Sequence, residues 1–182
     1  VLYLPLEEGS GTMTKDLSGW SNHGTLVNGP TWTTGKVGKC LSFDGVDDYV
    51  NISKIEFAKG ISGSFTIEMW IYPLVTHEID PESTSGTSGV NGQKYVISPT
   101  LEAGYSNDSG HAGAGISVGT NGISVYEHAS SYLPALLVWQ GTLSGWNNIT
   151  IVYTNNQPRL YVNGQLVRTG LQSTKTVHPS LE

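Results

Sequence analysis

The sequence predicts an all-β fold in which two antiparallel sheets pack face to face. Turn-forming residues interrupt the chain throughout, with 23 glycines and 8 prolines among its 182 residues. Turn signals at intervals of roughly 8 to 12 residues are typical of β-sandwiches and barrels. No segment keeps an amphipathic helical period long enough for an ordinary helix. We therefore predict a two-sheet sandwich of the jelly-roll kind.

The clearest strand of this fold runs from Ser64 to Tyr72. Its odd-numbered residues from Phe65 to Ile71 are apolar, and the residues between them are polar or aromatic. Successive side chains of a strand point to opposite faces, so one face of this strand enters the core. Other early and central strands are expected at Val1–Leu4, Cys40–Phe43, Tyr49–Ile52, Lys94–Ile97, Gly115–Val118, Gly122–Tyr126 and Leu136–Trp139.

A three-stranded meander is predicted from Trp146 to Thr169. The β-rich runs Asn148–Tyr153 and Arg159–Val162 are joined by a short polar connection. Asn163-Gly164 then offers the two-residue turn that hairpins favour most. The residues after this turn supply the third strand.

Two segments, Thr76–Gly92 and Ala103–Gly113, have the composition of long loops. Both are rich in Ser, Gly, Asn and acidic residues. Loops of this length are uncommon inside compact domains and are often functional or disordered. They are interpreted either as ordered binding loops or as mobile surface loops.

The bulk composition favours one domain over residues 1–182 and excludes some partners. The net charge is −6 and the pI is near 5.3, so an electrostatic hold on nucleic acid or on anionic membranes is not expected. No stretch is long and apolar enough to span a bilayer. Cys40 is the only cysteine, which excludes an internal disulfide and favours a core thiol. Because the chain begins inside a predicted strand, we expect a piece of a longer protein.

The most specific local pattern is a strand that leads into Tyr126, Glu127 and His128, followed closely by Tyr132. An aromatic ring can carry the apolar side of a sugar, and charged or bifunctional groups can bind its hydroxyls. These four residues therefore form a candidate glycan site at one edge of the sandwich. In the alternative interpretation, the tyrosines close the end of the sandwich and the histidine bonds the backbone. The candidate ligand-binding set is completed by Asn107, His111 and His178, since neighbouring loops of a sandwich cluster at its ends.

A calcium site is a second candidate. The turn from Asp44 to Asp48 offers three carboxylates around a glycine, and Asp16 with Asn22 offers more oxygen, the ligand type that calcium prefers. Asp16, Asn22, Asp44 and Asp47 are the predicted ligands. Less weight falls on the acidic residues of the first long loop, which are Glu78, Asp80 and Glu82. In the alternative, Asp44 only braces backbone amides of an ordinary turn.

Several stretches across most of the chain resemble bacterial LamG-like jelly-roll domains. The matching stretches, in the family's order, are Leu2–Gly11, Asp16–Gly19, Asn22–Leu26, Gly38–Val50, Phe65–Ile71, Trp146–Tyr153 and Leu160–Gln165. The resemblance implies the concanavalin A-like lectin and glucanase superfamily, and with it glycan or protein recognition, often with calcium, in secreted or surface proteins. The family's usual closing strand is not recognisable after His178, so we expect either that the domain lacks it or that it belongs to a remainder outside this sequence.

An enzyme is the runner-up hypothesis. Glu78-Ile79-Asp80-Pro81-Glu82 resembles the catalytic signature of the superfamily's glucanases, where one glutamate is the nucleophile and the other the acid and base. Pro81 cannot donate to a strand ladder, which argues against the regular strand that this signature needs.

The leading hypothesis is a non-enzymatic, extracellular, carbohydrate-binding module, the adhesive part of a larger bacterial surface protein or pilus. A glycoside hydrolase that uses Glu78 and Glu82 is the first alternative. A structural or protein-interaction domain is the second, because fold alone does not decide function.

Overall fold

The computed structural model describes residues 1–52, 60–100 and 110–180. It divides into two compact units, unit 1 (residues 1–57 and 181–182) and unit 2 (residues 58–180), and each is described by itself. The described part of the chain consists of strands and loops without an α-helix, so it includes no helix that could cross a membrane. The predicted all-β class is confirmed. The single domain over residues 1–182 stays a prediction.

Unit 1 contains two small antiparallel sheets. The first joins β1 (Met13–Thr14), β2 (Gly24–Val27) and β5 (Tyr49–Ile52) in that order, and the second pairs β3 (Thr31–Thr34) with β4 (Lys39–Ser42). The strand predicted at Val1–Leu4 is wrong. These residues form a loop in which Tyr3 bonds the turn around Asp16.

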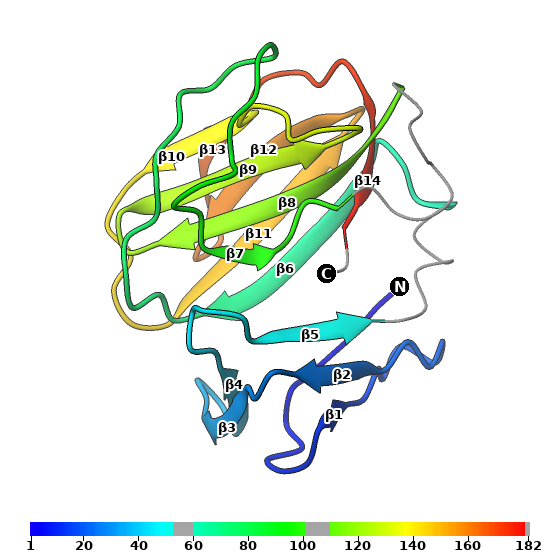
Figure 1. The fold of residues 1–182 in the computed structure, drawn as a ribbon, viewed down its shortest axis with the longest axis vertical. Helices are drawn as coiled ribbons and strands as arrows, with labels where there is room; N and C mark the ends of the chain where they lie inside the picture. The colour runs from blue at the N-terminus through cyan, green and yellow to red at the C-terminus, as the bar shows by residue number, and fades with distance from the viewer. Residues whose placement is uncertain (53–59, 101–109, 181–182) are drawn as a thin grey trace. The chain divides into compact units, whose positions relative to one another are not determined.

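Unit 2 is the sandwich. One sheet has the order β13 (Gln165–Thr169), β12 (Gln157–Val162), β11 (Asn147–Thr154) and β6 (Phe65–Ile71). The other has the order β10 (Leu137–Gln140), β9 (Gly122–His128), β8 (His111–Gly119) and β14 (Thr176–Pro179), and β7 (Tyr95–Ile97) also pairs with β8. Figure 1 shows β8 and β9 lying over β11 and β12.

The core of unit 2 lies between these two sheets. Ile116, Val125 and Leu137 of one sheet form a single buried cluster with Ile151 and Leu160 of the other. The alternation that predicted β6 places Ile67 opposite Ile151 on the inner face. Burial of these apolar faces against each other holds the sandwich together.

The predicted meander is confirmed as β11–β12–β13. Its two hairpin turns are centred on Asn155-Asn156 and Asn163-Gly164, and all four residues have positive φ, between 50° and 79°. A two-residue hairpin turn of this kind needs φ above zero at both positions, which Asn and Gly tolerate best.

The structure agrees with one of the two predicted long loops and describes the other only in part. Thr76–Gly92 forms no strand, as predicted, apart from one bridge between Glu82 and Ala135. The second predicted loop lies partly outside the described residues, and its end belongs to β8, which begins at His111. The last described strand, β14, pairs in parallel with β8. Absence of a closing strand stays a prediction.

Candidate functional site

Strand β9 separates the residues that the sequence grouped into one glycan site. The strand continues through His128, so Tyr126 and His128 point to the outer face of the sheet while Glu127 points to the inner face with Val125. Tyr126 has 0% of its surface exposed and Glu127 has 1%. A ligand on one surface therefore cannot contact all three side chains, and Tyr126 is not an open platform for a sugar.

The long loop Thr76–Gly92 covers the outer face of the sheet above Tyr126. The Tyr126 hydroxyl donates to Oδ2 of Asp80 at 2.7 Å. A Cβ on Gly89 would lie 2.6 Å from the Tyr126 ring, so this close approach requires glycine. Burial, and then the neighbouring Asp80 carboxylate, raises the pKa of Tyr126 well above its ordinary value. Tyr126 thus anchors the loop.

The other predicted ligand-binding residues of unit 2 form two aromatic pairs. His128 and Tyr132 meet edge to face with ring centroids 4.6 Å apart. Nδ1 of His111 lies 2.7 Å from Nε2 of His178, and Nδ1 of His178 lies 2.8 Å from the Ile61 carbonyl oxygen. Since that carbonyl can only accept, His178 donates from Nδ1 and accepts from His111 at Nε2.

The register places these two pairs near each other. Gly113 of β8 is paired with His128 of β9 on one side and with His178 of β14 on the other. The His128–Tyr132 and His111–His178 pairs therefore lie in neighbouring positions on the outer face of this sheet. Burial lowers the pKa of His128. The predicted ligand Asn107 lies outside the described residues.

The predicted metal ligands lie in two places. Asp16 and Asn22 belong to one hydrogen-bonded turn, and Asp44 and Asp47 belong to an exposed cluster of carboxylates. The Asp16 carboxylate accepts hydrogen bonds from the Tyr3 amide, the Ser18 amide and hydroxyl, and the Asn22 amide, at 2.7 to 3.0 Å. Burial alone would raise the pKa of Asp16, but these hydrogen bonds outweigh it and hold the pKa well below its ordinary range. Asp16 is thereby committed to its own turn.

The turn from Asp44 to Asp48 brings together oxygen atoms that could bind one cation. Single carboxylate oxygens of Asp44, Asp47 and Asp48 lie within 4.8 Å of one another. Asp44 also accepts from the Val46 amide and Asp48 from the Asp44 amide, as in an ordinary braced turn. Three hard oxygen donors fit part of a calcium shell, which needs 6 to 8. Calcium binding stays a prediction.

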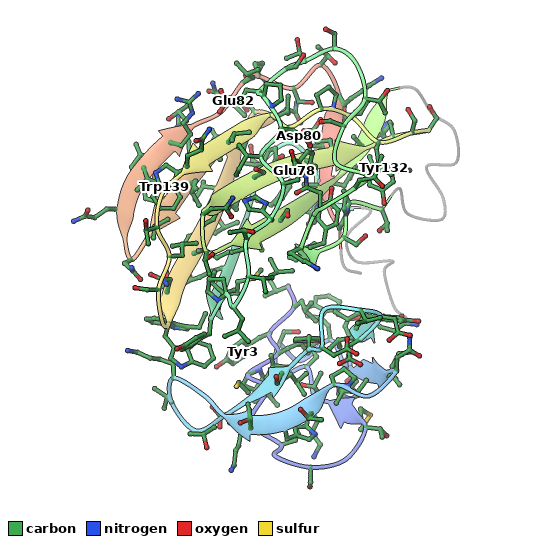
Figure 2. The ribbon with its side chains drawn as sticks, turned by 60° about the vertical axis from the view of Figure 1, so that its left-hand side comes forward. Tyr3, Glu78, Asp80, Glu82, Tyr132 and Trp139 are labelled. Atoms are coloured by element: carbon green, nitrogen blue, oxygen red, sulfur yellow. The ribbon has the colours of Figure 1, made fainter. Side chains whose placement is uncertain are left out.

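A groove of about 600 Å³ lies on the surface of unit 2. We call it the Trp139 groove. It is lined by Ile79–Glu82 of the long loop, Val138–Gln140 of β10, and Val167 with Arg168 of β13. Figure 2 shows Trp139 and Tyr132 at opposite sides of unit 2, so the groove is separate from the Tyr132 end of the site that the sequence predicted.

Trp139 has a fixed position in this groove. Its ring is half-buried and packs against the core of the sandwich. A Cβ on Gly141 would lie 2.1 Å from Cζ2 of the Trp139 ring, so the ring lies directly against the Gly141 backbone. Gln140 beside it is exposed. The groove therefore presents a supported aromatic side chain next to polar groups.

Glu82 ties the loop to both strands that border the groove. Its Oε1 accepts from the Val138 amide and from Nε of Arg168, each at 2.8 Å, and Oε2 pairs with Nη2 of Arg168. The hydrogen bond and charge of Glu82 raise the pKa of Arg168. Asp80, which also lines the groove, accepts from Tyr126, Gly89 and Gln93.

Sequence reasoning missed the residues that give the groove its character. Trp139 was expected only as the end of a strand, and Arg168 only as part of the meander. Glu82 was noticed through the glucanase-like stretch, but its partner Arg168 is 86 residues away. A single sequence without a fold gives no signal that connects them.

The fold and the groove together define a class, which is a lectin-like β-sandwich domain. A laminin G-type family model, described as the concanavalin A-like lectin/glucanases superfamily, matches residues 44–180. The chain belongs to this superfamily, which confirms the resemblance seen in the sequence. The match takes in β5 of unit 1 and all of the strands of unit 2.

A solved structure with a similar fold is domain 4 of AbnA, a GH43 extracellular arabinanase from Geobacillus stearothermophilus, in complex with arabinotriose. The TM-score is 0.51 at 14% sequence identity, and the match covers 86% of this chain and 69% of that chain. At this identity the likeness shows a shared fold. No curated protein matches the sequence.

Proposed function

We propose that this domain binds carbohydrate in the Trp139 groove and does not hydrolyse it. The observation that carries the proposal is the groove itself, which is lined by Trp139 and by residues with charged side chains, among them Asp80 and Arg168. A sugar ring offers an apolar face for an aromatic side chain and hydroxyls for carboxylate and guanidinium groups. Sites of this kind combine apolar area with a few fixed polar groups.

Two further findings support the proposal. The superfamily to which the chain belongs includes lectins by its description. The similar solved domain was crystallised with arabinotriose, which makes arabino-oligosaccharides the first ligands to test.

The decisive experiment is calorimetric titration with arabinotriose, preceded by a glycan array that ranks other oligosaccharides. Trp139→Ala is expected to weaken binding by about tenfold or more, as for a central aromatic contact. Trp70→Ala is the matched control, because Trp70 is 52% exposed on β6 and does not line the groove. Equal affinities for wild type and the Trp139 variant would contradict the groove as the site.

Gly141→Ala is a second way to disturb Trp139 without removing it. The added methyl would meet the ring at 2.1 Å, so the ring must shift. We expect weaker sugar binding with the aromatic side chain still present. Near-ultraviolet circular dichroism checks that the tryptophan environment changes and that the domain stays folded.

The hydrolase alternative names Glu78 and Glu82, of which Glu82 lines the groove with Asp80, whereas Glu78 is exposed and is not part of its lining. Hydrogen bonds favour a structural role for the two lining residues, since Glu82 is engaged by Arg168 and the Val138 amide, and Asp80 by Tyr126. A glycosidase needs one free nucleophile or base and one proton donor at the scissile bond. Release of reducing ends from arabinan that disappears in Glu82→Gln would establish the enzyme instead.

The setting of the domain is part of the proposal. We propose an extracellular module of a larger bacterial surface protein, where polysaccharide ligands are accessible. The arabinanase with the similar domain is described as extracellular. Binding of the purified domain to cell surfaces, competed by the best soluble glycan, would test an adhesive role.

A further inference from the structure

A second pocket lies beside the Trp139 groove. It has a volume of about 220 Å³ and contains Glu127. Glu82 lines the groove and the next residue, Ser83, lines the pocket, while Val138 lines the groove and Leu136 the pocket. At ~3.3 Å per residue of extended chain, two residues place the linings only about 7 Å apart. One oligosaccharide can therefore reach both.

Glu127 enters this pocket from the inner face of β9 as a buried carboxylate with unused acceptor capacity. Its Oε2 accepts from the Ser173 hydroxyl at 2.7 Å, and its Oε1 accepts from the Tyr153 hydroxyl at a long 3.4 Å. A carboxylate has about four acceptor positions. Donors from the described residues thus occupy about half of them, and Glu127 is one of the residues that line the pocket.

The residues that line the pocket indicate which kind of ligand could donate further hydrogen bonds to Glu127. Thr84 and Ser173 supply hydroxyl groups, while Leu133 and Pro134 supply apolar wall. The positive charge of Lys175 acts on Glu127 from the same pocket, which disfavours a second cation there. A neutral polyhydroxyl group fits best, because its hydroxyls can donate to Glu127 and accept from Lys175.

We propose that the Glu127 pocket is a second carbohydrate subsite, which binds a sugar unit adjacent to the one held beside Trp139. This inference rests on the proposed function, because both subsites would hold the same oligosaccharide. Glu127 accepts hydrogen bonds from hydroxyls of that second unit. The domain therefore recognises short stretches of a chain in preference to single sugars.

A chain-length series tests the second subsite. Affinities for arabinose and arabinotriose are measured by NMR titration for wild type, Trp139→Ala, Glu127→Gln and Thr84→Ala. We expect Glu127→Gln to lose about tenfold affinity for arabinotriose and to keep the affinity for arabinose. Thr84 is an exposed residue that lines the pocket, and Thr84→Ala should lose less of the affinity for arabinotriose. This variant serves as the test if Glu127→Gln does not fold.

The pH dependence gives a readout that a merely structural Glu127 would not change. Hydrogen bonds from sugar hydroxyls favour the charged form of a carboxylate. Burial raises the pKa of Glu127 to about 7. The hydrogen bonds from Ser173 and from Tyr153 of β11, and the charge of Lys175, lower this pKa and so offset part of the rise. Arabinotriose should lower that pKa, measured by carboxyl ¹³C shifts, and its affinity should rise between about pH 5 and 8. Glu127→Gln should remove this rise.

The outcomes separate the two proposals. Loss of binding in Trp139→Ala with unchanged arabinotriose affinity in Glu127→Gln and Thr84→Ala overturns the second subsite and leaves the groove standing. Absence of binding by wild type to both sugars overturns the arabinan form of the proposed function and the subsite with it. A pKa of Glu127 that is the same with and without saturating arabinotriose also overturns the subsite.

Discussion

Two buried carboxylates, one in each unit, respond to burial in opposite ways. Asp16 of unit 1 accepts four hydrogen bonds, and its pKa lies well below the ordinary range. Glu127 of unit 2 accepts two, one of them long, and burial raises its pKa to about 7. Both side chains are at most 5% exposed. At Asp16 the hydrogen bonds outweigh burial and the pKa falls, whereas at Glu127 burial outweighs the hydrogen bonds and the pKa rises.

This difference separates a structural carboxylate from one with capacity for a ligand. Three of the four donors to Asp16 are backbone amides of unit 1, two from its own turn and one from Tyr3 of the N-terminal loop, so folding itself supplies them. The donors to Glu127 are two hydroxyls, one from β11 and one from the segment after β13, and Glu127 lines a pocket. Burial of a carboxylate without enough hydrogen-bond donors costs free energy. A ligand that donates hydrogen bonds to Glu127 would offset part of this cost.

The largest effect is expected for Asp16→Ala. The change removes the common acceptor of the Tyr3, Ser18 and Asn22 amides and should destabilise unit 1 by about 4 kcal/mol, since hydrogen bonds to charged groups are the strong ones. Hydrogen exchange of these three amides measures the loss locally. Asp44→Ala is the matched control, because that exposed carboxylate accepts from Val46 and should cost under about 1 kcal/mol. Equal losses in the two variants would contradict the comparison.

A somewhat smaller effect is expected for Glu127→Gln, and it depends on pH. The folded form of Glu127 has a pKa of about 7 against an ordinary 4.5, so between these values the folded state binds more protons than the unfolded state. The stability of the wild type therefore falls as pH rises from 4.5 to 7, by about 3 kcal/mol, and is level above that. Glu127→Gln should lack this slope and be the more stable protein at pH 8.

Urea unfolding at several pH values, followed by hydrogen exchange in β9 and β11, measures this slope. The shift of Asp16 has the opposite sign, since a lowered pKa makes unit 1 lose stability as pH falls below about 4. The two units should therefore show opposite pH dependence under acid conditions. A wild-type curve for unit 2 that is level between pH 4.5 and 7 would refute the assignment to Glu127.

The sequence predicted those features of the fold that depend on local pattern. Alternation in β6 and the Asn-rich turns of the meander fix strand and hairpin positions from neighbouring residues alone. Strands Gly24–Val27 and Thr31–Thr34 were missed because each is short, and the first begins with a glycine while the second follows a proline. Val1–Leu4 looked β-rich, but its backbone bonds the Asp16 turn.

The candidate site was less predictable, because it depends on contacts across the chain. Tyr126, Glu127 and His128 were grouped as a strand tip, whereas β9 continues through them and sends alternate side chains to opposite faces. The glucanase-like stretch drew attention to Glu82, but its role comes from Arg168 and the Val138 amide. Such partners become visible only when the order of strands in both sheets is known.

The smallest effect is expected from calcium, and it extends the comparison to carboxylates that are exposed. Asp44, Asp47 and Asp48 hold oxygens within 4.8 Å of one another, and Asp44 and Asp48 each accept a hydrogen bond from one backbone amide. A cation that binds only the folded turn at tenfold its dissociation constant would add about 1.4 kcal/mol. Thermal melts with calcium chloride and with chelator measure this gain, with Asp47→Asn as the variant that should abolish it. Identical melting temperatures of the wild type in calcium and in chelator would mean that these three carboxylates, like Asp16, serve only their own turn.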